Sequence, residues 1–248
     1  MVKIYSHKRI PLAPCAALAP PTQHREPAIS DTQNTFQAVI WDFGGVITSS
    51  PFEAFKRYEA EHNLPENFIR GINATDPDTN AWALFERSEI DAARFDTQFL
   101  AEAEAQGHSV RGADVLALLA GSVRPEMVAV LDRLKQDGYR IACITNNVKT
   151  GSGAGMARTD EKAAQVAEVL ARFENVIESS EVGIRKPDPA IYLMACDKLG
   201  VAPENCIFLD DLGINLKPAR ALGMATIKVG AAAPAIEELS KLLGHSLA

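Results

Sequence analysis

The residues most suited to chemistry in this chain are polar or charged side chains at or near the ends of short apolar segments. These side chains are Asp42, Thr145, Asn146, Lys186, Asp210 and Asp211. Each alone is typical of a turn or of a solvated charge, but an unpaired charge at the end of a buried strand costs stability unless something binds it. Two adjacent carboxylates are still less favourable without a cation, and Mg²⁺ prefers hard oxygen ligands. The set therefore indicates a Mg²⁺ site.

The chemistry that these side chains would support together is phosphoryl transfer. Mg²⁺ is commonly shared between protein carboxylates and a substrate phosphate. The hydroxyl of Thr145 and the main-chain and side-chain amides of Asn146 would bind phosphate oxygens, and Lys186 would neutralise the gathered negative charge. One carboxylate would then attack phosphorus and form an acyl phosphate.

The elements that must bring these side chains together are predicted to be the strands of a parallel sheet. Short apolar, β-branched segments at 38–41, 141–145, 206–209 and 225–229 predict strands, and helical patterns lie between the last three. Strands that alternate with helices are typical of an α/β fold whose sheet is covered on both faces. The carboxyl ends of such strands share one edge, where ligands bind.

A long helical segment separates the first predicted strand from the second. Residues 51–123 have amphipathic helical patterns and no convincing strand. We expect an all-helical cap there, with residues 36–50 and 124–248 forming the α/β core. Its first helix is expected to have Ser50 as N-cap, with Glu53 completing a capping box. The glycine-rich stretch 150–165 matches neither a phosphate-binding loop nor a dinucleotide fingerprint and is interpreted as a surface loop.

The composition of the chain argues against nucleic acid and a membrane span as its partners. The net charge of −7 argues against a nucleic-acid binder, and no apolar stretch reaches the roughly 20 residues that span a bilayer. The four cysteines lie mostly in apolar runs and are expected to be reduced, which favours a cytoplasmic protein. The predicted phosphoryl-transfer chemistry makes a small phosphorylated metabolite the expected partner. Residues 1–35 are proline-rich and are predicted to be a disordered extension, with an organelle-targeting segment as the alternative.

The order Asp, Thr, Lys, Asp-Asp, in the segments "WDFGGVITSSP", "ITNN", "SSEVGIRKPDPAIY" and "FLDDLGINLKPARALGMATIKV", resembles the haloacid dehalogenase superfamily of hydrolases. Within its subfamily IA, the chain is most similar to the group that contains the N-terminal phosphatase domain of soluble epoxide hydrolases. The resemblance covers about residues 36–229. It implies a Rossmann-like core and Mg²⁺-dependent hydrolysis of small phosphate monoesters through an aspartyl-phosphate.

The resemblance also implies roles for single residues. Asp42 corresponds to the nucleophile and a metal ligand, and Lys186 to the residue that stabilises the nucleophile and the transferring group. Thr145 and Asn146 correspond to residues that hold the substrate phosphate.

The implied metal site is completed by residues near both ends of the core. Asp211 corresponds to the principal late metal ligand and Asp210 to the supporting acid of that motif. The main-chain carbonyl of Gly44 corresponds to a further ligand.

The chain departs from the superfamily pattern at Gly44. The general acid of the superfamily is normally an aspartate at this position, two residues after the nucleophile. Proton transfer of this kind is worth about 10²–10⁴ in rate. We therefore expect slow hydrolysis or a preference for leaving groups that need little protonation, with the substrate, a water molecule, Glu86 or Glu89 as other proton sources.

Two further functions remain open at the level of sequence. A metal-independent 2-haloacid dehalogenase also lacks the second aspartate, although the paired Asp210 and Asp211 favour metal and phosphate. A non-catalytic, regulatory protein that binds phosphate would retain the same phosphate site.

Overall fold

The computed structural model describes residues 36–147 and 160–247. The predicted extension at 1–35 and residues 150–159 of the glycine-rich stretch lie outside the described residues. Among the described residues, no helix is both long enough and apolar enough to cross a membrane.

The centre of the fold is a five-stranded parallel sheet with the order β3-β2-β1-β4-β5. Its strands are β1 (Ala38–Trp41), β2 (Arg140–Thr145), β3 (Asn175–Glu178), β4 (Cys206–Asp210) and β5 (Ala225–Lys228). The predicted α/β fold is therefore confirmed. The sequence pattern missed β3, an edge strand with only two apolar residues and one buried residue.

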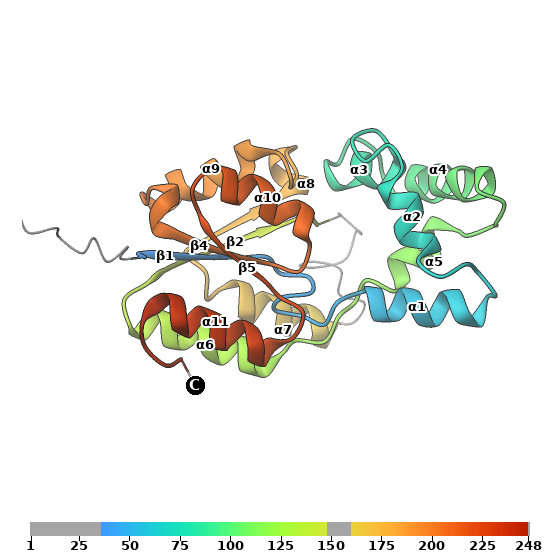
Figure 1. The fold of residues 1–248 in the computed structure, drawn as a ribbon. Helices are drawn as coiled ribbons and strands as arrows, with labels where there is room; N and C mark the ends of the chain where they lie inside the picture. The colour runs from blue at the N-terminus through green and yellow to red at the C-terminus, as the bar shows by residue number, and fades with distance from the viewer. Residues whose placement is uncertain (1–35, 148–159, 248) are drawn as a thin grey trace, which may run out of the picture. The chain divides into compact units, whose positions relative to one another are not determined.

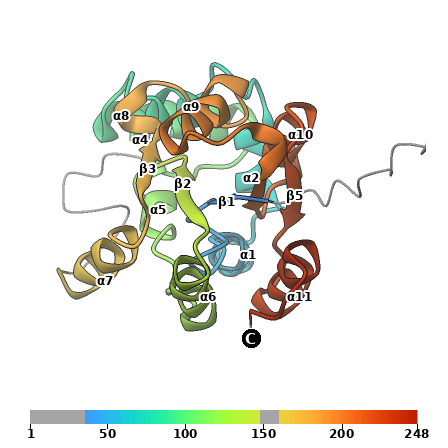
Figure 2. The ribbon, with the colours of Figure 1, turned by 90° about the vertical axis from the view of Figure 1, so that its left-hand side faces the viewer.

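Helices cover both faces of this sheet (Figures 1 and 2). One face carries α6 (Pro125–Gln136), α7 (Asp160–Leu170) and α11 (Ala232–Leu243). The other carries α8 (Ser179–Val182), α9 (Pro189–Leu199), the short 3₁₀ helix η1 (Pro203–Asn205) and α10 (Gly213–Ala221). Because both faces are covered, all four residues of β1 are buried and the strand reads as a continuous apolar run.

Five helices follow β1 along the chain before α6 begins. They are α1 (Phe52–Glu61), α2 (Phe68–Ala74), α3 (Ala81–Glu86), α4 (Ala92–Ala105) and α5 (Gly112–Ala117). Their aromatic and aliphatic side chains form a separate hydrophobic cluster that includes Phe55, Phe85, Phe95 and Phe99. The exact extent of the cap, 51–123, stays a prediction.

The register of the central strands aligns the predicted site residues. Trp41 pairs with Cys143 on β2 and with Leu209 on β4, and the main-chain N–H of Asp42 donates to the carbonyl of Leu209 at 2.8 Å. The next residue or two beyond each pair are therefore brought to the same carboxyl edge of the sheet.

The start of α1 differs from the prediction. The helix begins at Phe52, Pro51 is its N-cap residue, and no side chain caps this end. The predicted capping box between Ser50 and Glu53 is therefore wrong. Ser50 Oγ accepts a long hydrogen bond from the N–H of Phe52 at 3.5 Å and also donates to Asp211 Oδ2 at 3.3 Å. The hydroxyl is oriented toward a carboxylate of the candidate site, which the local pattern does not reveal.

Candidate functional site

Asp42 lies at the carboxyl end of β1 and is 7% exposed. Its Oδ1 accepts a hydrogen bond from the N–H of Phe43 at 2.7 Å and lies 2.8 Å from Lys186 Nζ. Within the described part of the chain, its Oδ2 accepts no hydrogen bond. One oxygen of the carboxylate is thus fixed, and the other is available for a ligand or for attack.

Lys186 connects two of the aspartates. Its side chain is 1% exposed, and Nζ lies 2.8 Å from both Asp42 Oδ1 and Asp210 Oδ2. Burial disfavours the charge, but the two carboxylates outweigh burial and raise the pKa of Lys186 above its usual value. The lysine is therefore a permanent cation of the site.

The two late aspartates have different surroundings. Asp210 is completely buried and accepts from Lys186 Nζ, from Asn215 Nδ2 at 3.1 Å and from the N–H of Leu212 at 2.8 Å. Asp211 is only partly buried and accepts from Ser50 Oγ. Burial, followed by the negative charge of Asp210, raises the pKa of Asp211 to about 6. Asp210 is thus committed to protein donors, whereas Asp211 has capacity for a cation.

Asp42, Lys186, Asp210 and Asp211 are called the charge cluster below. Within it, carboxylate oxygens of all three aspartates lie within 4.8 Å of one another. One lysine leaves this group of three acids with excess negative charge, and carboxylate oxygens are the ligands that Mg²⁺ prefers. The donor set therefore fits a divalent cation of this kind.

Gly45 makes room for the charge cluster. A Cβ atom at this position would lie 2.2 Å from Asp211 Oδ2, and the residue has a φ of +78°. Both the left-handed backbone and the close approach of the carboxylate require glycine here. The second glycine of "WDFGG" is thus explained by geometry.

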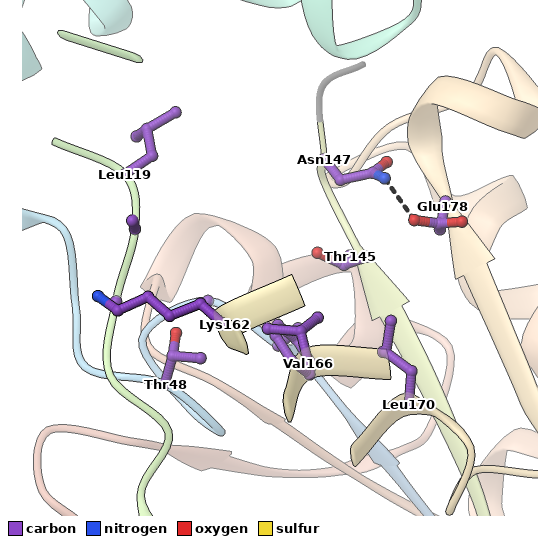
Figure 3. Close-up of a pocket in the computed structure, with 12 residues that line it drawn as sticks. Thr48, Leu119, Thr145, Asn147, Lys162, Val166, Leu170 and Glu178 are labelled. Atoms are coloured by element: carbon purple, nitrogen blue, oxygen red, sulfur yellow. Dashed lines mark hydrogen bonds between the residues drawn. The ribbon is translucent and has the colours of Figure 1, made fainter. Parts of the chain in front are cut away.

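Gly44 has the opposite surroundings. A Cβ atom added there would meet nothing within 4 Å. The residue lines a cavity of about 50 Å³, which we call the Gly44 cavity (Figure 3). Its polar lining residues include Thr48, Thr145, Asn147 and Glu178.

The remaining wall of the Gly44 cavity is largely apolar. Leu119, Val166 and Leu170 contribute to it (Figure 3). The sequence-predicted phosphate ligand Thr145 thus lines the same cavity as Gly44, beside the loop that follows Asp42.

Asn146 is placed differently from the prediction that its side chain holds phosphate. Its Oδ1 accepts from the N–H of Lys186 at 2.8 Å, and its Nδ2 donates to the carbonyl of Lys186 at 2.9 Å. The side-chain amide is therefore used to hold the main chain of Lys186. A phosphate contact from the main-chain N–H of Asn146 stays a prediction.

Several residues that hold the site were missed from sequence. Asn215 donates to Asp210, and Asn147 Oδ1 accepts from both the N–H and the Oγ of Ser180. Their only signal is their closeness in sequence to predicted residues: Asn147 follows Asn146 directly in "TNN", and Asn215 comes four residues after Asp211 in "DDLGIN". The partner of each amide depends on tertiary contacts, which spacing does not encode.

The two glutamates considered as proton sources lie in unlike environments. Glu86, at the end of α3, is 5% exposed, and burial raises its pKa, opposed by Arg185 and Trp82. Glu89 is exposed and pairs with Arg87 at 2.6 Å. Only Glu86 contacts a predicted site residue, through Asn146 Nδ2 at 3.4 Å.

Comparison with known proteins places these residues within a family of hydrolases. The model of a family described as haloacid dehalogenase-like hydrolase matches residues 36–223. Acyl-CoA dehydrogenase family member 10 of Mus musculus is 33% identical over 218 residues, covering 86% of this chain and 20% of that protein. Bifunctional epoxide hydrolase 2 of Mus musculus is 31% identical over 219 residues, covering 84% of this chain and 39% of that protein. The chain thus spans well under half the length of both.

Solved structures show the same fold. An HAD family enzyme from Bacteroides thetaiotaomicron, solved in complex with magnesium and inorganic phosphate, matches with a TM-score of 0.50 and 21% identity. The match covers 79% of this chain and 95% of that chain. Other relatives in sequence include both phosphatases and dehalogenases.

Proposed function

Because the chain belongs to the haloacid dehalogenase-like hydrolases, we propose that it hydrolyses small phosphate monoesters with Mg²⁺ through an aspartyl-phosphate. The observation that carries the proposal is the arrangement around Asp42. One of its oxygens is fixed by Lys186 and Phe43, the other accepts no hydrogen bond from the described residues, and carboxylate oxygens of Asp42 and Asp211 lie within 4.8 Å of each other. A nucleophile that is held, charge-compensated and adjacent to cation ligands suits phosphoryl transfer.

In the first step, Asp42 Oδ2 attacks phosphorus and the bond from phosphorus to the ester oxygen breaks. Lys186 compensates the negative charge of the nucleophile and of the transferring group, and the hydroxyl of Thr145 donates to a phosphate oxygen. Asp42, Asp211 and the carbonyl of Gly44 would hold Mg²⁺, which when bound supplies further positive charge to the phosphate. Asp210 would support this site by anchoring Lys186.

In the second step, water attacks phosphorus of the acyl phosphate, and inorganic phosphate leaves with Asp42 restored. Both steps need a proton transfer that residue 44 does not provide, since glycine has no ionisable group. The leaving oxygen takes its proton from water or from the substrate itself. The chain is therefore expected to favour aryl or acyl phosphates, whose leaving groups need little protonation, and to turn over slowly.

Phosphate release from a panel of aryl, acyl, sugar and lipid phosphates tests the proposal. We expect release with Mg²⁺ that stops with a chelator, fastest for the aryl and acyl esters. Asp42→Asn keeps the size of the side chain and removes the nucleophilic carboxylate, so it should release no phosphate above the uncatalysed rate. Full activity of this variant would exclude Asp42 as the nucleophile.

The absence of an acidic side chain at Gly44 favours two other functions. A 2-haloacid dehalogenase would release chloride from 2-chloropropionate without a metal and leave every phosphate ester intact. A non-catalytic phosphate-binding protein would bind inorganic phosphate with Mg²⁺ and release nothing from the panel. The three clustered carboxylates support the metal-dependent phosphatase over the dehalogenase.

A further inference from the structure

Glu86 joins a helix of the segment after β1 to the loop that carries Lys186. Its Oε1 accepts from Trp82 Nε1 at 2.9 Å. Its Oε2 lies 2.6 Å from Arg185 Nε and accepts from Asn146 Nδ2 at 3.4 Å. The carboxylate is therefore surrounded by three donors, an arrangement that suits a buried anion held in one position.

The backbone around Glu86 is fixed as well. Its carbonyl accepts from Ser179 Oγ at 2.7 Å, and Ser88 Oγ donates to the carbonyl of Ser180 at 2.9 Å. Arg185, the ion-pair partner, also donates from Nη1 to the carbonyl of Pro77 at 2.8 Å. The end of α3 is thus attached to both α8 and the Lys186 loop, so Glu86 has little freedom to move without its partners.

Glu86 is connected to Lys186, a member of the charge cluster, through two residues, Asn146 and Arg185. Asn146, which contacts Glu86, holds the N–H and the carbonyl of Lys186. Arg185, which pairs with Glu86, is the residue before Lys186 in the chain. Because Lys186 Nζ lies 2.8 Å from two carboxylates, a small displacement of its main chain would disturb the nucleophile.

We propose that Glu86 is a positioning residue for the phosphoryl transfer, fixing Asn146 and Arg185 so that Lys186 stays between Asp42 and Asp210. This inference rests on the proposed function for its kinetic consequence. Glu86 accepts hydrogen bonds from Trp82 and Asn146 and forms an ion pair with Arg185, so in this proposal it holds charge rather than delivering a proton.

Steady-state kinetics with p-nitrophenyl phosphate and Mg²⁺ tests this role. Glu86→Gln keeps the shape but weakens the bonds to Arg185 and Asn146, and kcat should fall about 10- to 100-fold with KM changed less than about threefold. Ser88→Ala removes a neighbouring bond to α8 without touching Asn146 or Lys186. This control should keep kcat within about twofold of the wild type, since it leaves the positioning of Lys186 intact.

A double variant separates positioning from the cost of an unpaired buried arginine. Glu86→Gln combined with Arg185→Met removes both charges, which restores stability relative to Glu86→Gln alone. The loss in kcat should persist in the double variant, because Asn146 still lacks its carboxylate partner. Recovery of kcat together with stability would overturn the proposal in favour of a purely structural role.

Amide hydrogen exchange at Lys186 gives a readout that needs no turnover. The N–H of Lys186 donates to Asn146 Oδ1, so Glu86→Gln should accelerate its exchange at least about tenfold relative to Ser88→Ala. Equal exchange in the two variants would overturn the inference about Glu86, whatever the activity. Absence of phosphate release by the wild type, with accelerated exchange in Glu86→Gln, would instead refute the proposed function alone.

Discussion

The charge cluster and the Gly44 cavity both adjoin the loop that follows Asp42 and are built differently. In the charge cluster, Lys186 contacts two carboxylates at 2.8 Å, and Asp210 accepts bonds from three residues. Beside Gly44, an added Cβ would meet nothing within 4 Å. The charge cluster is thus held by close polar contacts, whereas a side chain at residue 44 would have open space. Under the proposed function, this contrast would account for a metal site combined with slow turnover.

Alanine at each glycine of "GG" would test the contrast most strongly. Gly45→Ala places Cβ against Asp211 and strains a left-handed residue, so Mg²⁺-dependent phosphate release should fall more than about 100-fold. Gly44→Ala is the matched control and should keep activity within about threefold. Initial rates over a Mg²⁺ titration measure both. Similar losses in the two variants would mean that the two sides are equally constrained.

Introducing an acid at residue 44 would test whether the missing proton donor limits turnover. Gly44→Asp should raise kcat for alkyl phosphates up to about 100-fold and change it little for aryl phosphates, because only the former need a proton. Gly44→Asn has the same size without the acid and should give no gain. If asparagine accelerated the reaction as well as aspartate did, packing rather than proton transfer would limit turnover.

The smallest expected effect is on the free energy of unfolding of the protein without metal, to which the charge cluster contributes. Since burial raises the pKa of Asp211 to about 6 in the folded state, its ionisation disfavours folding above that pH. Without Mg²⁺, the free energy of unfolding should therefore rise as pH falls from 7 through 6 toward the pKa of the unfolded chain. Asp211→Asn removes the contribution of Asp211 to this dependence and should add about 1–3 kcal/mol at pH 7. A dependence of the same sign should persist from Asp42, whose pKa burial also raises.

Urea denaturation at pH 7 and pH 5, with and without Mg²⁺, measures this effect. Mg²⁺ should stabilise the wild type at pH 7 and should stabilise Asp211→Asn much less, because a ligand of the ion has been lost. Equal stabilisation of both proteins by Mg²⁺ would remove Asp211 from the proposed metal site.

The sequence was sufficient for four of the five strands, and for the central ones burial on both faces leaves a clear signal. The segment 38–41 is apolar throughout, and the residue that follows it is charged, so both the strand and the position of Asp42 are evident. The edge strand β3, "NVIE", lacks this signal since most of its residues are only partly buried. The other edge strand, β5, also has only one buried residue but was predicted, so a weak signal does not always hide a strand.

The partners of the site residues were less accessible to sequence reasoning. Ser50 has the local pattern of a helix cap, and it accepts from the N–H of Phe52 but also donates to Asp211, 161 residues away. Asn146, itself predicted to bind phosphate, holds the main chain of Lys186 with its side chain. In both cases a short polar side chain has a distant partner that the local sequence does not reveal.

The most direct test of the central claim is mass spectrometry of the protein after acid quench during turnover of p-nitrophenyl phosphate. Because Gly44 also leaves the second step without a base, the aspartyl-phosphate should accumulate, and the peptide that contains Asp42 should gain the mass of one phosphoryl group. The gain should be absent without Mg²⁺ and in Asp42→Asn. Phosphate release with no covalent adduct at Asp42 at any time would contradict the account.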